Sequence, residues 1–148
     1  MKGFVIEKND EHYTENLSLH QIDTEINRKK EFNNVSIINP VNSNCICIIN
    51  SINIGCANDE FKILVGEQVD EKLNKDKQGA FYIFCDKLHL MKDELLHIST
   101  IRKCNNSSIE ILKKQFIILL PKGCIYIKTD NPIKNIKIRM NWVEEKIY

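Results

Sequence analysis

The feature that most constrains this chain is a strict alternation of apolar and polar side chains close to its C-terminus. Successive side chains of a β-strand point to opposite faces of the sheet, so period two predicts one buried and one solvated face. The apolar set is Ile136, Ile138, Met140 and Trp142, and the polar set is Asn135, Lys137, Arg139 and Asn141. We therefore expect a strand here, with the Trp142 ring in a core rather than on a sugar-binding surface.

Two further strands are expected in the region from Gln115 to Glu145. Phe116–Leu120 is an apolar run that ends at Pro121–Gly123, where proline fixes φ and glycine permits positive φ. Cys124–Thr129 is a second run. The segment Asp130–Pro132 then carries turn residues, because Asp and Asn bond their own backbone and Pro presets φ. The pattern predicts three consecutive strands joined by two turns.

Short strands are also expected earlier in the chain. Cys45–Ile54 carries apolar side chains on both faces, which is typical of a strand covered on both sides. Isoleucine occurs 24 times, and its branched Cβ favours a pleated surface. The other expected strands are Gly3–Glu7, Val35–Asn39, Phe61–Val65, Gly79–Cys85 and Ile109–Leu112. This spacing predicts an all-β fold, an antiparallel β-sandwich or jelly roll of about eight strands.

Three segments between these strands differ from them in composition or in the spacing of their apolar residues. Glu67–Gln78 is rich in charged residues and predicts a solvated loop. Leu88–Ile98 reads either as two short strands or as one helix, and the helix is favoured by a stripe of Leu88, Met91, Leu95 and Ile98. Asn105–Ser108 predicts a turn.

The first 31 residues predict a polar N-terminal arm, extended or partly helical, ahead of a β-sandwich domain at residues 32–148. Leu19, Ile22 and Ile26 recur at helical spacing, and basic residues follow them as at a helix C-terminus. One thin apolar stripe buries little surface. The segment is therefore either an arm that folds onto a neighbouring subunit, which we favour, or a surface excursion.

Composition indicates one ordinary globular chain. The formal net charge is +1, so nothing global indicates nucleic-acid binding, for which a basic stripe is expected. Tyr126 is the one aromatic candidate for base stacking beside the basic closing strands. The apolar patch before Glu7 is too short for a signal peptide, and no run is long enough to span a membrane. We expect a protein that is made and kept in a cytosol, or assembled there before release, with reduced cysteines.

No motif for catalysis, phosphate binding or a metal is found in the sequence. Cys45 and Cys47 share one face of a strand, but no second cysteine pair follows, so buried thiols are expected rather than a zinc site. His89 and His97 show no ligand spacing. Adjacent Glu144 and Glu145 point to opposite faces and do not flank one substrate bond. The sequence predicts no enzyme and no cofactor.

Two segments resemble small virion proteins of tailed bacteriophages. The first is VSIINPVNSNCICIINSINI, with Asn39-Pro40 before a long strand. The second is ILLPKGCIYIKTDNPIKNIKIRMNWVEE, whose matching residues are Leu120, Pro121, Gly123, Asn131, Trp142 and Glu144. The resemblance covers about a third of the chain. It implies a protein that serves as a capsid decoration, a head fibre, or a tail or baseplate component, commonly as a trimer. Such a protein is assembled in the host cytoplasm and located in the virion.

The sequence and the resemblance together predict a non-enzymatic structural protein of a phage particle. Its expected partners are copies of itself, with a trimer favoured, and other virion proteins; no nucleic acid and no membrane are expected. A tail or baseplate role is the alternative within this class, and a carbohydrate-binding adhesin module that contacts a surface glycan is the rival outside it. The candidate interaction residues are Leu19, Ile22, Ile26, Tyr82, Tyr126, Lys137 and Arg139.

Overall fold

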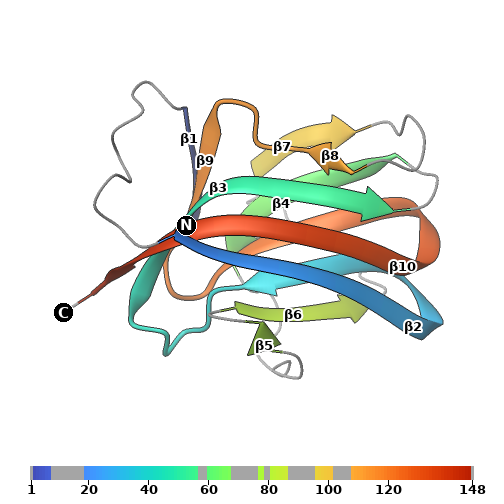
Figure 1. Ribbon diagram of the computed structural model, residues 1–148, viewed down its shortest axis with the longest axis horizontal. Coiled ribbons are helices and arrows are strands. Elements are labelled where there is room, and N and C mark those ends of the chain that lie inside the picture. Colours follow the sequence, from blue (N-terminus) through green and yellow to red (C-terminus); the bar gives the residue numbers. More distant parts are fainter. Residues whose placement is uncertain are drawn as a thin grey trace.

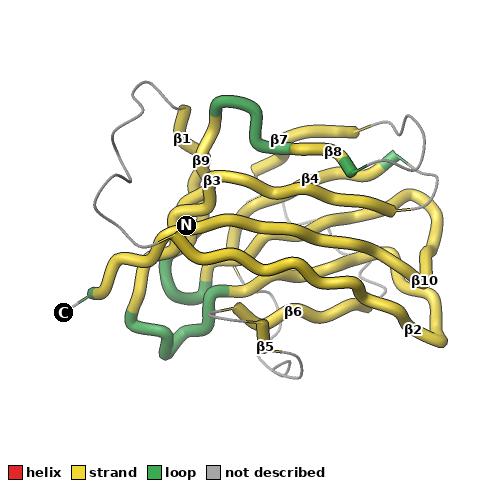
Figure 2. The backbone as a smooth tube through the Cα atoms, viewed as in Figure 1, coloured by secondary structure: helices red, strands yellow, loops and turns green. Residues whose placement is uncertain are grey.

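The computed structural model describes residues 2–7, 19–56, 60–67, 77–78, 81–86, 96–101 and 108–147. Every regular element in these residues is a β-strand (Figure 2). The strands are β1 (Gly3–Glu7), β2 (Leu19–Ile38), β3 (Cys45–Cys56), β4 (Phe61–Glu67), β5 (Lys77–Gln78), β6 (Phe81–Asp86), β7 (Leu96–Ile101), β8 (Ile109–Glu110), β9 (Gln115–Leu119) and β10 (Gly123–Lys146). All pairings between them are antiparallel, so the predicted all-β antiparallel fold is confirmed; its assignment to a sandwich or jelly roll stays a prediction.

The two long strands β2 and β10 pair with each other along nearly their whole length. Their pairing is interrupted where both strands bend, with residues 129–132 of β10 opposite Asn33 and residues 28–31 of β2 opposite Lys134. Extra residues of this kind bend a strand and increase its twist. Figure 1 shows β2, blue to cyan, and β10, orange to red, turning over together at this bend.

The bend divides the sheet into two halves that face each other. One half runs β1-β9-β3-β10-β2 through the C-terminal part of β10 and the N-terminal part of β2, with β8 on β3. The other half runs β7-β4-β10-β2-β6-β5 through the remaining parts of the same strands. Trp142 of the first half lies edge-on to Phe81 of the second, with ring centroids 4.9 Å apart. The core therefore lies between the two halves.

The alternation at the C-terminus decides which side chains enter this core. The predicted apolar set of β10 is buried and the predicted polar set faces outward or lies at the surface. The second half contributes its own inward side chains, which are also apolar. Together the core includes Ile136, Ile138, Met140 and Trp142 with Phe61, Ile63, Ile125, Ile127, Phe81 and Ile83.

Several expected features differ from the structure. The Asp130–Pro132 segment is not a turn between two strands; it lies inside β10, at the bend. The helical spacing of residues 19–26 is also misleading, because these residues belong to β2. Leu96–Ile98, the end of the expected helix, is part of β7, while residues 88–95 lie outside the described residues.

Three expected segment boundaries also differ from the structure or lie partly outside its described residues. β2 continues through the expected domain boundary between residues 31 and 32. Of the expected 67–78 loop, Glu67 ends β4 and Lys77–Gln78 forms β5; residues 68–76 lie outside the described part. Of the expected 105–108 turn, only Ser108 is described.

Asn39 joins four strand ends. Its buried side-chain amide donates to the carbonyl oxygens of Cys45, at 2.9 Å, and Leu119, at 3.0 Å. Its backbone N–H donates to the Gly123 carbonyl, and its backbone carbonyl accepts from the Lys122 N–H. Because buried polar groups need partners, this one residue satisfies backbone atoms at the ends of β2, β3, β9 and β10.

We expect Trp142→Ala to lower the free energy of unfolding by about 3–5 kcal/mol, because the 2 % exposed ring fills the space between the halves. Equilibrium denaturant unfolding measures this. Val41→Ala is the control, since the Val41 side chain is 71 % exposed. A loss below about 1 kcal/mol for Trp142→Ala would contradict the core position.

We expect Asn39→Asp to lower the free energy of unfolding by more than about 2 kcal/mol, because it replaces the buried donor with an oxygen facing two carbonyl oxygens. Asn42→Asp is the matched control in the neighbouring turn, where the side chain is exposed; it should change stability by less than about 0.5 kcal/mol. Thermal and denaturant unfolding of both variants test this, and equal stabilities would contradict the role of Asn39.

Candidate functional site

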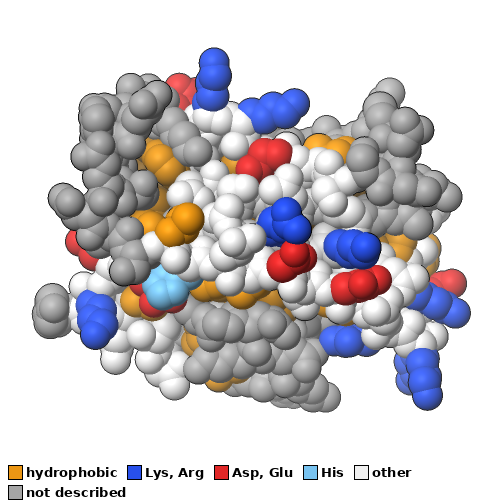
Figure 3. Space-filling view, in the orientation of Figure 1, with side chains coloured by type: hydrophobic (Ala, Val, Ile, Leu, Met, Phe, Trp, Pro, Cys, Tyr) orange, Lys and Arg blue, Asp and Glu red, His pale blue; other side chains and the backbone are white. Residues whose placement is uncertain are grey.

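The outward face of the first half carries charged side chains of both signs. Alternation places Asp23 and Glu25 of β2 beside Arg139 and Lys137 of β10, each pair directly opposite in the register. β3 continues the first row with Asn53, opposite Arg139. Figure 3 shows acidic and basic side chains alternating across this face.

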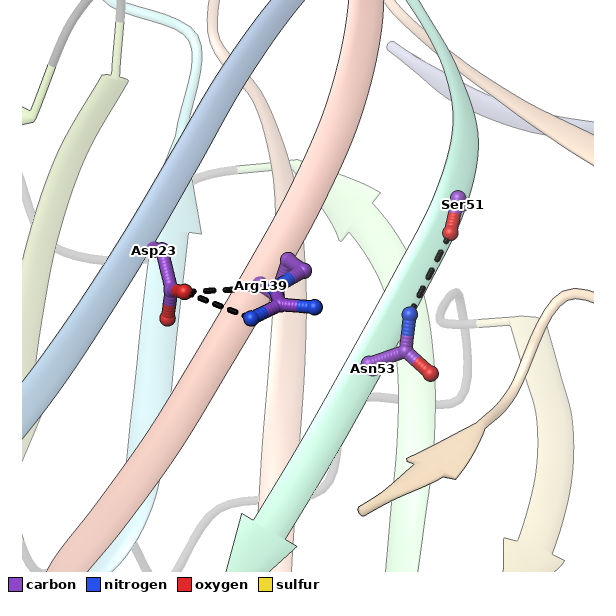
Figure 4. Close-up of polar contacts among 4 residues, drawn as sticks. All are labelled: Asp23, Ser51, Asn53 and Arg139. Atoms are coloured by element: carbon purple, nitrogen blue, oxygen red, sulfur yellow. Dashed lines mark hydrogen bonds and ion pairs between the residues drawn. The ribbon is translucent and has the colours of Figure 1, made fainter.

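Arg139 and Asp23 form an ion pair on this face. The guanidinium donates from Nη2 at 2.8 Å and from Nε at 3.2 Å, both to Oδ2 of Asp23 (Figure 4). The two side chains are 56 % and 60 % exposed. Exposed pairs contribute only about 0–1 kcal/mol, so this pair can be rearranged by a partner at little cost.

Glu110 borders the same face and has a structural role. Its carboxylate accepts from the Ser51 hydroxyl and, at 2.8 Å, from the Ile52 backbone N–H. This contact adjoins the place where the β3–β10 register shifts between Asn141 and Trp142. The Asn53 amide donates to Ser51 Oγ at 3.4 Å, along the same strand (Figure 4).

The edge of β2 borders this face. Between Leu19 and Asn27, β2 pairs with β10 on one side and with no described strand on the other. Leu19 is 61 % exposed, whereas Ile26 is 7 % exposed and Ile22 packs against the core. Of the three apolar interaction candidates, Leu19 is the most exposed. The side chains of residues 22 and 26 point to the inner face of the sheet, whereas that of Leu19 points to the outer face.

The two tyrosine candidates lie in the other half of the sheet. Tyr126 of β10 is 3 % exposed, and its hydroxyl donates to the Glu67 carbonyl at 2.7 Å. Its ring therefore offers no open face for base stacking. Tyr82 of β6 is half-buried and lies opposite Ile38. The structure thus brings together Leu19, Lys137 and Arg139, and it places the tyrosines elsewhere.

The sequence analysis missed a polar row across the second half. Lys62, Lys128, Asn34 and Asp86 follow one another on β4, β10, β2 and β6. The Asn34 amide, fully buried, donates to Asp86 Oδ1 and Ser36 Oγ, both at 2.9 Å. Burial lowers the pKa of Lys128, which the Asp86 carboxylate partly opposes. The sequence signal for this row was the presence of polar Asn34 and Ser36 inside an otherwise apolar strand.

A hollow of about 800 Å³ lies at the bend of β2 and β10. Its lining includes four cations, Arg28, Lys29, Lys30 and Lys134, against two carboxylates, Glu31 and Asp86. This excess of positive charge suits an anionic group. Residues 28–32 of the lining belong to the irregular stretch of β2, Lys134 belongs to β10, and Cys85 and Asp86 belong to β6, so the hollow lies where β6 adjoins the bend.

Metal-ligand groups converge at the opposite end of the first half. Ligand atoms of Cys45, Cys47 and Glu144 lie within 4.8 Å of one another. Burial raises the pKa of the Cys47 thiol, and neighbouring Cys45 and Glu144 raise it further. Sequence reasoning treated the two cysteines alone, because the spacing along the chain does not show which carboxylate lies opposite them.

Comparisons with known proteins found no match to this chain. No family model matches the chain, and searches of curated proteins and of solved structures return no match. The described part of the chain contains no helix that could cross a membrane.

We expect Cys124 to make stability fall at alkaline pH. Burial raises the pKa of its thiol above the ordinary value, so the thiol stays protonated in the folded chain and ionises at about pH 8.5 in the unfolded chain. The unfolded state then binds fewer protons, and the free energy of unfolding decreases by up to about 1.4 kcal/mol per pH unit for this group.

Denaturant unfolding of the reduced protein between about pH 8.5 and about pH 10 measures the effect. Cys124→Ala removes this contribution and keeps the contributions of all other titrating groups. The curve of the wild type should therefore be steeper than that of the variant, and parallel curves would contradict the buried thiol.

Proposed function

We propose that this chain is a non-enzymatic structural protein of a phage particle, a capsid decoration or outer capsid accessory protein that acts by symmetric assembly. The observation that supports this best is the long edge of β2 from Leu19, which no described strand covers, beside a face of paired charges. An uncovered edge presents backbone donors and acceptors to a strand of another chain.

The polar face gives such an assembly its specificity. Asp23 and Glu25 alternate with Arg139 and Lys137, so a neighbouring copy can match charges of both signs in only a few orientations. Leu19 adds an exposed apolar anchor at the start of the edge. A closed ring of such contacts, with a trimer favoured, satisfies every edge without forming open filaments.

A carbohydrate-binding adhesin module is the second candidate. The outward face carries Asn53, Asn141 and Asp23 at neighbouring register positions, and amides and carboxylates are the groups that bind sugar hydroxyls. The half-buried Tyr82 is the aromatic candidate for stacking on a sugar. Glycan-array binding that is lost in Tyr82→Ala would favour this function over assembly. A tail or baseplate role remains the alternative within the structural class.

The mass of the full-length chain in solution, measured by analytical ultracentrifugation over a wide concentration range, tests the assembly proposal. We expect an oligomer, and we expect Leu19→Lys to dissociate it, because the substitution places a charge at the start of the β2 edge. Val41→Lys is the matched control: Val41 is also exposed, at 71 %, but lies in the turn after β2.

A monomer at every concentration, or equal dissociation by the two variants, would contradict self-assembly through this edge. Mass spectrometry of purified particles from a host that expresses the chain tests the virion location. Exclusion of the chain from the particles would contradict that part of the proposal.

A further inference from the structure

Two thiols and a carboxylate lie side by side across the strands β3 and β10. Cys45 and Cys47 point to the same side of β3, and their Sγ atoms are 3.9 Å apart. Glu144 lies directly opposite Cys47 in the antiparallel register. The ligand atoms of all three residues lie within 4.8 Å of one another. Local alternation and cross-strand pairing thus bring together three groups of the kind that ligate metals.

The distance between the sulfurs fits a shared metal ion. Tetrahedral zinc with Zn–S bonds of about 2.3 Å requires sulfurs about 3.8 Å apart, close to the separation found here. A disulfide bond requires about 2.05 Å, and both cysteines are free thiols. A carboxylate oxygen of Glu144 lies within 4.8 Å of both sulfurs, within reach of the same ion.

His20 lies beside this group, on the strand on the other side of β10, but it is not one of the three residues whose ligand atoms lie within 4.8 Å of one another. It lies opposite Trp142 in the β2–β10 register and stacks on the indole, with ring centroids 5.6 Å apart and planes 20° apart. Its Nε2 is 3.9 Å from Oε2 of Glu144. The stack holds the imidazole beside the carboxylate.

Trp142 also orients the carboxylate. Its indole N–H donates to Oε1 of Glu144 at 3.1 Å. The other carboxylate oxygen, Oε2, is the one that lies 3.9 Å from His20 Nε2. Such outer contacts fix the orientation of metal ligands and raise affinity.

The exposed fraction of these four residues increases from the cysteines through Glu144 to His20. Cys47 is 0 % exposed and Cys45 is 7 % exposed, whereas the Glu144 and His20 side chains are 28 % and 43 % exposed. The thiols are therefore shielded from water, and the imidazole side provides an entry path for an ion. Two thiolates, an imidazole and a carboxylate form a donor set that favours zinc over the harder ions magnesium and calcium.

We propose that Cys45, Cys47, Glu144 and His20 bind one Zn²⁺ ion, which joins β2, β3 and β10 at this end of the sheet. Binding forms two zinc–sulfur bonds, and the two thiol protons pass to solvent. Four protein ligands leave no position for substrate, so the site is structural rather than catalytic. The inference goes beyond the assembly role and does not depend on it.

Titration of the reduced, chelator-treated full-length chain with Co²⁺ tests the site. We expect one equivalent to give thiolate-to-cobalt charge-transfer absorption and the visible bands of tetrahedral cobalt, and Zn²⁺ to displace it. Competition with a chromophoric chelator measures the zinc affinity. The zinc-loaded chain should also unfold at higher temperature, since an ion that binds only the folded state stabilises it.

Matched variants identify the ligands. Glu144→Gln should weaken zinc binding by at least about tenfold, because removing even an outer-shell partner costs that much. Glu145→Gln, the exposed neighbour on the opposite face, should leave the affinity unchanged. Cys45→Ala should abolish the charge-transfer band, while Cys124→Ala removes a buried thiol of the other half and should keep it.

His20→Phe keeps an aromatic ring on Trp142 and removes the ligand nitrogen, and it should also weaken binding. If Cys45→Ala fails to fold, the solvent-side variants Glu144→Gln and His20→Phe decide the question. Absence of the charge-transfer band at one equivalent of Co²⁺, or equal affinities of the Glu144 and Glu145 variants, would overturn the proposal. Unchanged affinity in His20→Phe would overturn the assignment of His20.

Discussion

The pairing of β2 with β10 is the interaction on which the rest of the structure depends. Both strands are long enough to cross the two halves of the sheet, and at the same place each has residues that lack a partner on the other strand, 28–31 in β2 and 129–132 in β10. A regular pair of that length would twist without folding over. The matched irregularities bend both strands together, so β3, β4 and β6 pair with parts of them that face each other. The core between the halves is a consequence of this bend.

The sequence predicts the parts of this fold that are local. Alternation between residues 135 and 142 identifies the strand and the side chains it buries, because period two has a direct structural cause. The segment Asp130–Pro132 was predicted to be a turn, since turns and bends use the same residues. What distinguishes them is the partner strand: β2 continues beside β10 through this point, and that pairing joins residues about a hundred positions apart in the chain. No local pattern contains this information.

The candidate interaction and ligand residues also divide into those that local pattern places and those that depend on strand pairing. Leu19, Ile22 and Ile26 fit a helical stripe by spacing, but they lie on a strand, where Leu19 is exposed and the other two turn inward. Lys137 and Arg139 were correctly placed on a solvated face, because alternation alone decides it. The proximity of Glu144 to Cys47 and of His20 to Trp142 follows from the register of three strands. A one-residue shift in register would separate every one of these groups.

The proposed assembly surface and the proposed zinc site meet at the start of β2, and strand geometry keeps them separate. Leu19 and His20 are neighbours in sequence, yet their side chains point to opposite faces of the sheet. An ion bound by His20 would hold the first residues of the β2 edge against β10, at an end of the strand where no described strand pairs with its other side. It would do so without occupying the outward face that carries Leu19, Asp23 and Arg139. Metal binding would therefore order the edge for a neighbouring chain while leaving its contacts unchanged.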